Sequence, residues 1–340
     1  GAPAGTVDSR LRIHLLGRHA HRTPPAYGPY RALLADRVTY VDAPERADLV
    51  ICAFDLDIRE NAAALLAARR RHPALRLVLF SEEPLWDTAG RPFDPERARR
   101  LALGGEHIPY VFLCHANCDV FAFERIPYYV TTDDRFFLDY GRLFARNAAE
   151  TPAEIADRWA RAPAPAAFVA ERRLGAEHAA DFPEHEIWGL GAYRTALAEA
   201  VTQPGVLRVG HGWSDRRRQA LPDWRLDKLS MLDGRARIVS GLENTHQNAY
   251  VTEKLFDAFA VGARPLYHAG PRHAVWRLVA PESIINLYGL TVDEAAARIA
   301  RADADAAALD AYRAAQADLA RRFGDVGALA EERRRVAAAI

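Results

Sequence analysis

The sequence predicts an α/β protein built from two doubly wound domains. Short and continuously apolar runs such as Leu75–Phe80 are typical of strands that are buried on both faces of a parallel sheet. Segments with helical periodicity alternate with these runs, which is the order of elements in such sheets. The 340 residues suffice for two domains, each with a core of its own.

The N-terminal α/β domain is expected to span residues 1–155. Its expected strands are Leu11–Leu16, Val38–Val41, Ala47–Phe54, Leu75–Phe80, Tyr110–Cys114 and Val120–Phe123. Its expected helices are Glu60–His72 and Pro95–Leu103. A capping box at Thr151 and Glu154 starts a further helix, with Pro152 at its first position. The Ala-Pro repeat of residues 162–165 then indicates a stiff linker.

A second α/β domain is expected over residues 156–310, followed by a C-terminal helical segment over residues 311–340. The expected strands are Ala166–Ala170, Val206–Gly210, Ala236–Leu242, Arg264–Tyr267 and Ser283–Leu287. Expected helices include Ala192–Val201 and one that starts near Thr252. Thr291 and Glu294 form another capping box, which opens an Ala-rich helix.

The composition narrows the classes of function. The chain has 45 basic and 45 acidic residues, a balance that argues against nucleic acid as the partner. Its three cysteines indicate buried thiols rather than a disulfide framework. Cys114, His115 and Cys118 lack a second ligand pair at zinc spacing, so the sequence implies no metal site. Neither a signal peptide nor an apolar run of the ~20 residues that cross a bilayer is evident. Because the chain opens with Gly1, we expect a processed or recombinant fragment. Whether a membrane segment was removed is a question that the sequence leaves open.

The stretch from Glu243 to Gly262 organises the second domain. Thr252 and Gly262 are typical of a helix start and of the residue after a helix end. Lys254 then lies in the first turn, where the helix dipole disfavours a cation. An anion bound at the helix N-terminus would resolve this conflict.

This stretch resembles the donor-binding motif of the α-1,3-fucosyltransferases, glycosyltransferase family 10. The family pattern is close to (F)EN(S/T), a short gap, Y(V/I)TEK, a helix, and then Pro before an apolar strand. The matching segments here are residues 242–245 (LENT), 250–254 (YVTEK), 263–267 (ARPLY), 281–286 (PESIIN) and the segment from Arg125 to Phe136. The chain departs from the pattern at Leu242, where Phe is usual, and at residues 268–270. The resemblance covers residues 75–290 and is strongest over 236–290.

The resemblance implies a GT-B fold, in which two Rossmann-like domains face a cleft and the terminal helices pack back. It also implies an inverting bacterial glycosyltransferase of glycan biosynthesis that transfers fucose from GDP-fucose to a glycan acceptor. No further cofactor and no divalent metal is expected. We expect a cytoplasmic protein, with room for peripheral association at the inner face of the membrane. The oligomeric state stays open.

The expected donor-binding residues surround two helix starts. Lys254 and Arg194 are the candidates for the diphosphate, because a cation at a helix N-terminus is favoured only next to an anion. Glu253 is the candidate for the ribose hydroxyl groups. Asn244 and Tyr250 either fix the nucleotide or the sugar, or only stabilise their loop.

Three further features near these residues are more ambiguous. Gly210 and Gly212 resemble a glycine-rich turn at the nucleotide, although a simple turn is equally consistent with them. Lys228 is interpreted as a solvated helix residue, despite its likeness to a family lysine. The arginines at 216–218 indicate a solvated face.

The catalytic base is expected in the N-terminal domain, at the end of the strand Leu75–Phe80. A carboxylate at the carboxyl end of a parallel strand faces the side of the sheet where ligands bind. Aligning the strand with the family selects Glu82, whereas aligning Pro84 selects Glu83. We prefer Glu82 and expect the two adjacent carboxyl groups to raise each other's pKa. A solvated acid pair is the alternative interpretation.

Two other hypotheses are consistent with the same residues. In the first, the fold and chemistry are the same and the donor is a different nucleotide sugar. In the second, the chain is a non-catalytic module that binds a sugar or a nucleotide. The acceptor and the linkage cannot be read from the sequence.

Overall fold

The computed structural model describes residues 9–103 and 105–340. These residues divide into two compact units. Unit 1 holds the described residues up to Thr88 together with Asp94–Phe121 and Arg333–Ile340, and unit 2 holds Ala89–Phe93 and Ala122–Glu332. The main division lies at Phe121, earlier in the chain than the boundary at residue 155 expected from the sequence. The expected C-terminal segment 311–340 is shared between the units.

Unit 1 contains a six-stranded sheet in the order β2-β1-β3-β4-β6-β5. Its strands are β1 (Leu11–Leu15), β2 (Val38–Tyr40), β3 (Leu49–Cys52), β4 (Arg76–Phe80), β5 (Ala98–Leu103) and β6 (Glu106–Leu113). All pairs are parallel except that of β5 with β6. Numbered along the chain, the five parallel strands have the order 2-1-3-4-5. This is a doubly wound order in which ligands bind where the first strand borders the third.

Three α-helices belong to the N-terminal part of unit 1. They are α1 (Gly28–Leu34), α2 (Asp55–Glu60) and α3 (Ala62–Arg71). Leu65 and Ala68 of α3 join Val50 and Leu77 of the strands in one buried apolar cluster. This contact explains why the helical periodicity of α3 is visible in the sequence.

Unit 2 repeats the same strand order in a parallel sheet, β10-β7-β11-β13-β14. Its strands are β7 (Ala164–Val169), β10 (Leu207–Val209), β11 (Ala236–Ser240), β13 (Arg264–Tyr267) and β14 (Ile285–Asn286). A small antiparallel sheet joins β12 (Thr245–His246), β9 (Ile187–Gly189) and β8 (Asp181–Phe182). The predicted fold class of two Rossmann-like α/β domains is confirmed.

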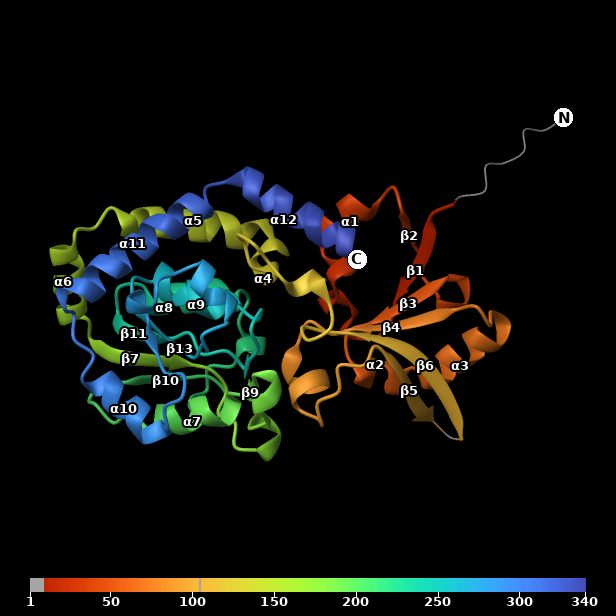
Figure 1. Cartoon of the computed structure of the whole chain (residues 1–340), viewed down its shortest axis with the longest axis horizontal. Helices are drawn as coiled ribbons and strands as arrows, with labels where there is room; N and C mark the ends of the chain where they lie inside the picture. The colour runs from red at the N-terminus through yellow and green to blue at the C-terminus, as the bar shows by residue number, and fades with distance from the viewer. Residues whose placement is uncertain (1–8, 104) are drawn as a thin grey trace. The chain divides into compact units, whose positions relative to one another are not determined.

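Helices cover both faces of the unit 2 sheet (Figure 1). The helices of unit 2 are α4 (Tyr128–Thr131), α5 (Asp134–Ala148), α6 (Pro152–Arg161), α7 (Gly191–Ala200), α8 (Trp224–Leu232), α9 (Glu253–Ala260), α10 (Val292–Ala300) and α11 (Ala306–Arg322). The last helix, α12 (Val326–Ala339), begins in unit 2 and ends in unit 1. On one face, Phe168 and Ile238 pack with α7 and α10. On the other face, their neighbours Ala167 and Val239 pack with α8 and α9. This alternation follows from the two-residue period of a strand.

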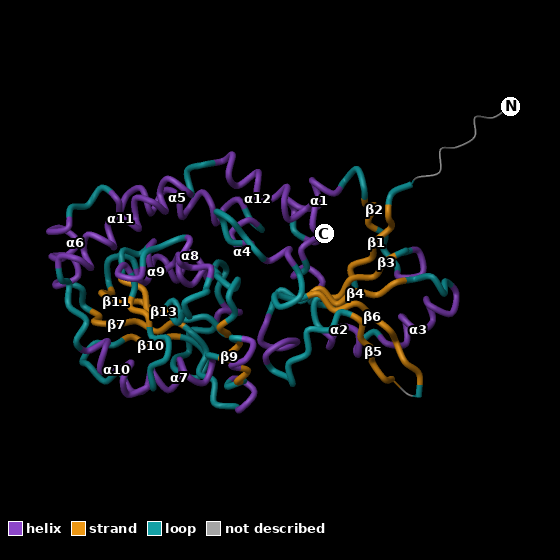
Figure 2. The backbone as a smooth tube through the Cα atoms, viewed as in Figure 1, coloured by secondary structure: helices purple, strands orange, loops and turns teal. Residues whose placement is uncertain are grey.

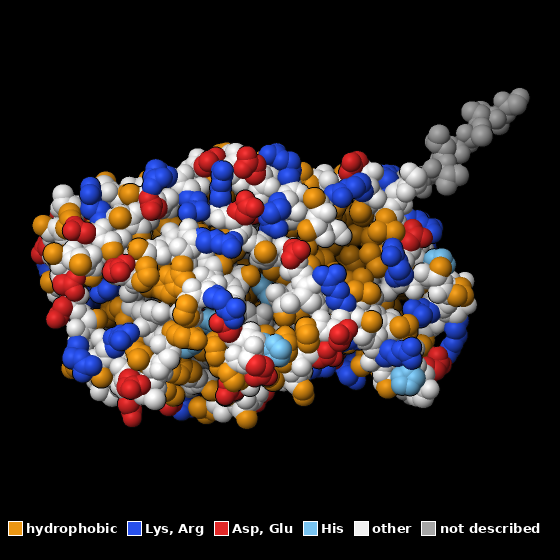
Figure 3. Space-filling view, in the orientation of Figure 1, with side chains coloured by type: hydrophobic (Ala, Val, Ile, Leu, Met, Phe, Trp, Pro, Cys, Tyr) orange, Lys and Arg blue, Asp and Glu red, His pale blue; other side chains and the backbone are white. Residues whose placement is uncertain are grey.

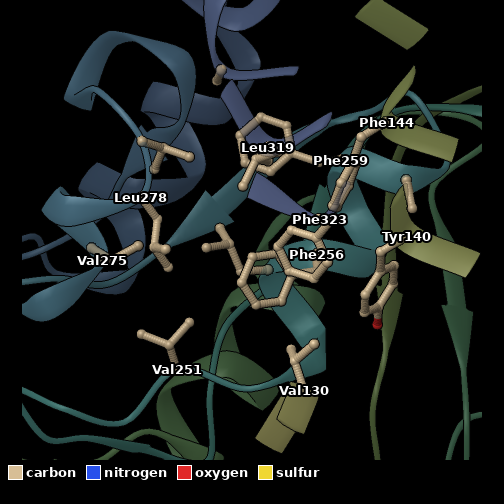
Figure 4. Close-up of a cluster of buried hydrophobic side chains, with 14 of the residues drawn as sticks. Val130, Tyr140, Phe144, Val251, Phe256, Phe259, Val275, Leu278, Leu319 and Phe323 are labelled. Carbon is tan, nitrogen blue, oxygen red and sulfur yellow. The ribbon is translucent and has the colours of Figure 1, made fainter. Parts of the chain in front are cut away.

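The largest apolar cluster lies where α5, α9 and α11 meet. Figure 4 shows Phe144, Phe256, Phe259, Leu319 and Phe323 in this cluster. Because α5 packs in this cluster, residues 122–155 belong to unit 2 rather than to the N-terminal domain.

Three local predictions are wrong. The segment Pro95–Leu103 was expected to be helical, but Ala98–Leu103 forms β5. Its pairing with β6 overrides the helix preference of its Ala and Arg residues, since a neighbouring strand supplies the backbone partners. The expected strand Val120–Phe123 begins instead in a short 3-10 turn, Asp119–Phe121. Ala164, expected in a linker, begins β7.

The expected helix caps are confirmed. Thr151 and Thr291 both form complete capping boxes with the glutamate three residues later. Thr252 is the N-cap of α9, and Gly262 follows that helix with a φ of 77°. The body of α9 from Leu255 to Ala260 is buried on all sides.

The described surface fits the balanced composition. On the face drawn in Figure 3, acidic and basic side chains are interspersed. The tube in Figure 2 shows strands and helices alternating through both units. Cys52 and Cys114 are buried free thiols and Cys118 is a partly buried one, as expected. Within residues 9–103 and 105–340, no helix is both long and apolar enough to cross a membrane.

Candidate anion-binding site

A cavity of about 190 Å³ lies in unit 2 at the carboxyl ends of the parallel strands. Val169 and Glu171 reach it from the end of β7, and Asn244 from the loop after β11. Because β7 borders β11 and is the first strand of the order 2-1-3-4-5, this is the switch point where doubly wound sheets bind ligands. Arg173, Arg194, Lys228 and Lys254 also line the cavity and make it cationic.

Arg194 lines the cavity from the first turn of α7. Its side chain is buried, and one guanidinium nitrogen donates to the Leu242 carbonyl oxygen at 3.3 Å. Its Nε is buried, and it has no hydrogen-bond partner among the residues that the structure describes. Burial, followed by the charge of Arg173, lowers the pKa of Arg194 to about 10. A buried guanidinium with so few acceptors is costly, and an anion in the cavity would offset that cost.

Lys254 reaches the cavity from the N-terminus of α9. The place of Lys254 in the first turn of a helix predicted an external anion as its partner, whereas the structure supplies partners within the chain. Its ammonium nitrogen lies 3.1 Å from the Thr252 hydroxyl, 3.2 Å from the Glu253 carboxylate and 3.5 Å from the Glu243 carboxylate. Lys254 is therefore held in place at the cavity wall before any ligand arrives.

Glu253 also lines the cavity, and its carboxylate lies 3.2 Å from the ammonium nitrogen of Lys254. Burial by itself raises the pKa of Glu253, but the ammonium groups of Lys254 and Lys228 lower it to about 2 overall. Glu253 is therefore ionised at neutral pH and can accept hydrogen bonds from hydroxyl groups.

The remaining residues predicted to bind a donor are in different positions. Asn244 and Gly210 line the cavity. Gly212 instead packs against Arg172, whose Cβ would lie 2.7 Å from a Cβ at this position. Tyr250 is buried, and its ring meets that of Tyr129 edge-on at 5.5 Å. Tyr250 is outside the cavity lining, so a role in stabilising its loop fits its position.

Two features of the cavity were missed by the sequence interpretation. Lys228 is buried rather than solvated, and it pairs with Asp257 at 2.8 Å. Arg216 and Arg218 line the cavity although they were read as part of a solvated face. Arg218 lies over the ring of Trp224 at 4.6 Å, a residue that also lines the cavity. Only the tertiary structure brings these residues to one place.

The predicted base residues follow β4 in unit 1. Glu82 and Glu83 are both buried, which rules out a solvated acid pair. The Tyr27 hydroxyl donates to Glu82 at 2.7 Å, and Arg22 lies 3.6 Å from Glu82 and 3.0 Å from Glu83. Burial alone would lower the pKa of Arg22, but the two carboxylates raise it overall. The backbone carbonyl of Glu82 also accepts a hydrogen bond from the ring of His115, whose pKa is lowered to about 4 by burial.

Among the described residues, no group of three or more His, Cys, Asp or Glu side chains is arranged to hold a metal ion. Cys114, His115 and Cys118 are therefore not gathered with further ligands in this part of the chain.

No protein-family model matches the chain, and no curated protein matches it. Among solved structures, it is similar to crystal structures of alpha1,3-fucosyltransferase. The structure with GDP-fucose has a TM-score of 0.43 and 17% identity, over 93% of this chain and 83% of that chain. The structure with GDP has 18% identity, and a further structure has 19%, at the same TM-score of 0.43 and the same coverage. A likeness this distant does not say which ligand the cavity binds.

Proposed function

We propose that this chain is an inverting glycosyltransferase that transfers fucose, or a closely related sugar, from a GDP-sugar to a hydroxyl group of a glycan acceptor. One observation carries the proposal: the buried guanidinium of Arg194 faces a cavity that Lys254 also lines. Most donors of this guanidinium lack a protein acceptor among the described residues. A diphosphate offers several charged oxygens to such a pair of cations.

The chemistry of sugar transfer gives each residue a task. As the bond to the sugar breaks, negative charge grows on the departing diphosphate, and Arg194 and Lys254 offset it. Asn244 and the ionised Glu253 line the same cavity and can bind hydroxyl groups of the nucleotide or of the sugar.

The acceptor hydroxyl must lose its proton, and we assign this step to the carboxylate pair of unit 1. Glu82 is the preferred base because Tyr27 fixes one of its oxygen atoms, whereas Glu83 makes the shorter contact with Arg22. General-base assistance is typically worth about 10²–10⁴ in rate.

GDP-fucose as donor is supported by the motif resemblance of residues 242–254. The cavity lining by itself does not favour one nucleoside diphosphate sugar over another. Its lining is also consistent with a module that binds a nucleotide sugar without catalysis.

Titration with GDP tests the proposal directly. We expect the protein to bind GDP, and Arg194→Met and Lys254→Met each to weaken binding by about 1.5–3 kcal/mol, the worth of a charge-assisted hydrogen bond. Arg235→Met is the matched control, because Arg235 is exposed and lies outside the cavity lining. Full GDP affinity in both cavity variants would remove these cations from the site.

A panel of nucleotide sugars separates the remaining hypotheses. Turnover of GDP-fucose supports the proposed donor, and turnover of another sugar with GDP-fucose inert refutes that donor. Binding without turnover for every donor and acceptor tried would favour the non-catalytic module.

A further inference from the structure

The chain uses lysine at two positions, Lys228 and Lys254, although it has 45 basic residues. Every other basic position is arginine. Both lysines line the same cavity. The chain thus favours a guanidinium nearly everywhere and keeps a compact ammonium group at two places that face one ligand site.

The ammonium group of Lys228 has donors to spare. Lys228 is 5% exposed on α8, and its Nζ donates to Asp257 on α9 at 2.8 Å. Asp257 is its one hydrogen-bond partner among residues 9–103 and 105–340. Because an ammonium group has three N–H donors, two remain for a ligand in the cavity that Lys228 lines.

Asp257 is itself held by a third helix. The Tyr140 hydroxyl, on α5, donates to the second carboxylate oxygen of Asp257 at 2.6 Å. Tyr140 is a member of the largest apolar cluster and lies at its edge, with the hydroxyl directed away from the apolar side chains (Figure 4). Burial, and then the Asp257 charge, raises the pKa of Tyr140 well above its ordinary value, so it stays a donor. Hydrogen bonds to Asp257 therefore connect α9 with α5 on one side and with α8 on the other.

Stability alone gives little reason to keep this arrangement. Lys228 and Asp257 have side chains that are 6% and 5% exposed. Removing two charges from water costs several kcal/mol per ion, and an apolar pair of the same volume is often equally stable or more stable. A ligand that uses the ammonium group accounts for the charge.

We propose that Lys228 binds the diphosphate of the ligand together with Lys254, and that Asp257 and Tyr140 are positioning residues for its ammonium group. This inference rests on the proposed function, because it takes the nucleoside diphosphate as the ligand. It adds a second lysine to the proposed site. It also adds Asp257 and the core residue Tyr140, which hold the ammonium group of that lysine in place.

The choice of lysine follows from the geometry. A guanidinium at position 228 would match the Asp257 carboxylate with two parallel hydrogen bonds, and fewer donors would remain for the cavity. Its larger planar group would also fill space that the ligand needs. Arginine is therefore expected to fail at this position, although the chain uses it at almost every other basic one.

The first test compares lysine with arginine and with methionine at position 228. We expect Lys228→Arg and Lys228→Met each to weaken GDP binding at least about tenfold, the loss of one charge-assisted bond. Arg235→Lys, the reverse exchange at an exposed position, is expected to leave GDP affinity unchanged. Pyrophosphate is the second probe, and the same variants should weaken it as well.

The second test separates positioning from a merely structural role. In Asp257→Asn the buried ammonium loses its counter-charge and gives up its proton more readily. We expect GDP affinity of Asp257→Asn to fall as the pH rises from about 7 to about 9, and this dependence to vanish in Lys228→Met/Asp257→Asn. Tyr140→Phe keeps the ring and is expected to weaken GDP binding about 2- to 10-fold.

The outcomes distinguish this inference from the function on which it rests. If the unaltered protein does not bind GDP, both are overturned. If Lys254→Met weakens GDP binding and Lys228→Arg and Lys228→Met do not, only the present inference is overturned. The double variant leaves no orphan charge in the core, so it keeps the test decisive if Lys228→Met does not fold. Flat pH profiles for both Asp257→Asn and the double variant would remove the positioning role.

Discussion

Glu243 caps the start of α9 through Thr252. One carboxylate oxygen of Glu243 accepts the backbone N–H of Thr252 at 2.8 Å, and the other accepts its hydroxyl at 2.7 Å. Burial raises the pKa of Glu243, although Lys254 at 3.5 Å opposes this shift. Glu243 is therefore a structural residue that joins the segment after β11 to the N-terminus of α9.

The first prediction follows from this cap. In Glu243→Gln, an amide NH₂ replaces one of the two accepting oxygens, so one donor of Thr252 loses its partner. We expect a loss of about 1–3 kcal/mol in the free energy of unfolding, measured in urea. Glu282→Gln is the control, since Glu282 is exposed. Equal stability of the two variants would show that the cap contributes little.

The second prediction concerns the carboxylate pair of unit 1. Glu82→Gln is expected to lower the rate of sugar transfer by about 10²–10⁴, because a glutamine cannot take the acceptor proton. GDP affinity should not change, since the cavity lining lies in unit 2. Glu83→Gln is the matched variant and should lose less. Transfer rates that survive in both variants would exclude a base role for either residue.

The third prediction is a loss of stability in mild acid. Burial lowers the pKa of His268 to about 4 and that of His273 to about 3. Because the ordinary value is about 6.5, the unfolded chain binds protons that the folded chain does not. Stability is therefore full above about pH 6.5 and falls at lower pH, by about 1.4 kcal/mol per pH unit for each such histidine.

Urea unfolding between about pH 5 and pH 7 measures this slope, above the range where most carboxylates titrate. His268→Asn should reduce the slope by the share of one histidine. His21→Asn, at an exposed position, should leave it unchanged. A stability that is constant over this range would contradict the burial of neutral histidines.

The fourth prediction concerns the turn after β10. Gly210 has a φ of 129°, and a Cβ there would lie 2.6 Å from the Ala170 carbonyl oxygen. Gly210→Ala is expected to cost about 1–3 kcal/mol of stability, because the strained backbone and the contact cannot both relax. Gly28→Ala is the control, since no atom lies within 4 Å of its added Cβ. Unfolding in urea should separate the two variants.

The elements that the sequence predicts well are those set by local chemistry. The apolar runs of β4 and β11 and the caps at Thr252 and Thr291 each lie within a few residues. The prediction for the β5 segment failed because its Ala and Arg residues favour a helix. Only its pairing with β6 makes this segment a strand. The small antiparallel sheet escaped notice because its strands are two or three residues long.

The prediction of the site residues was limited in the same way. Arg194 and Lys254 were predicted from their places at helix starts, and Glu253 from the resemblance of its segment; all three line the cavity. Lys228 was misread because its partner Asp257 is 29 residues away on another helix. The boundary between units was also misplaced, since it depends on the packing of α5 against α11. Contacts between distant segments leave no periodic pattern in the sequence.

The burial of α9 on every side ties ligand binding to the melting of unit 2. Its first turn lines the cavity, whereas Leu255 to Ala260 lie wholly in the core, so the helix cannot unravel without losing both. A ligand that binds only the folded form at about 100 times its Kd adds about 2.7 kcal/mol of stability. The melting temperature of the unaltered protein can therefore show which candidate ligands bind the cavity, before any reaction is assayed.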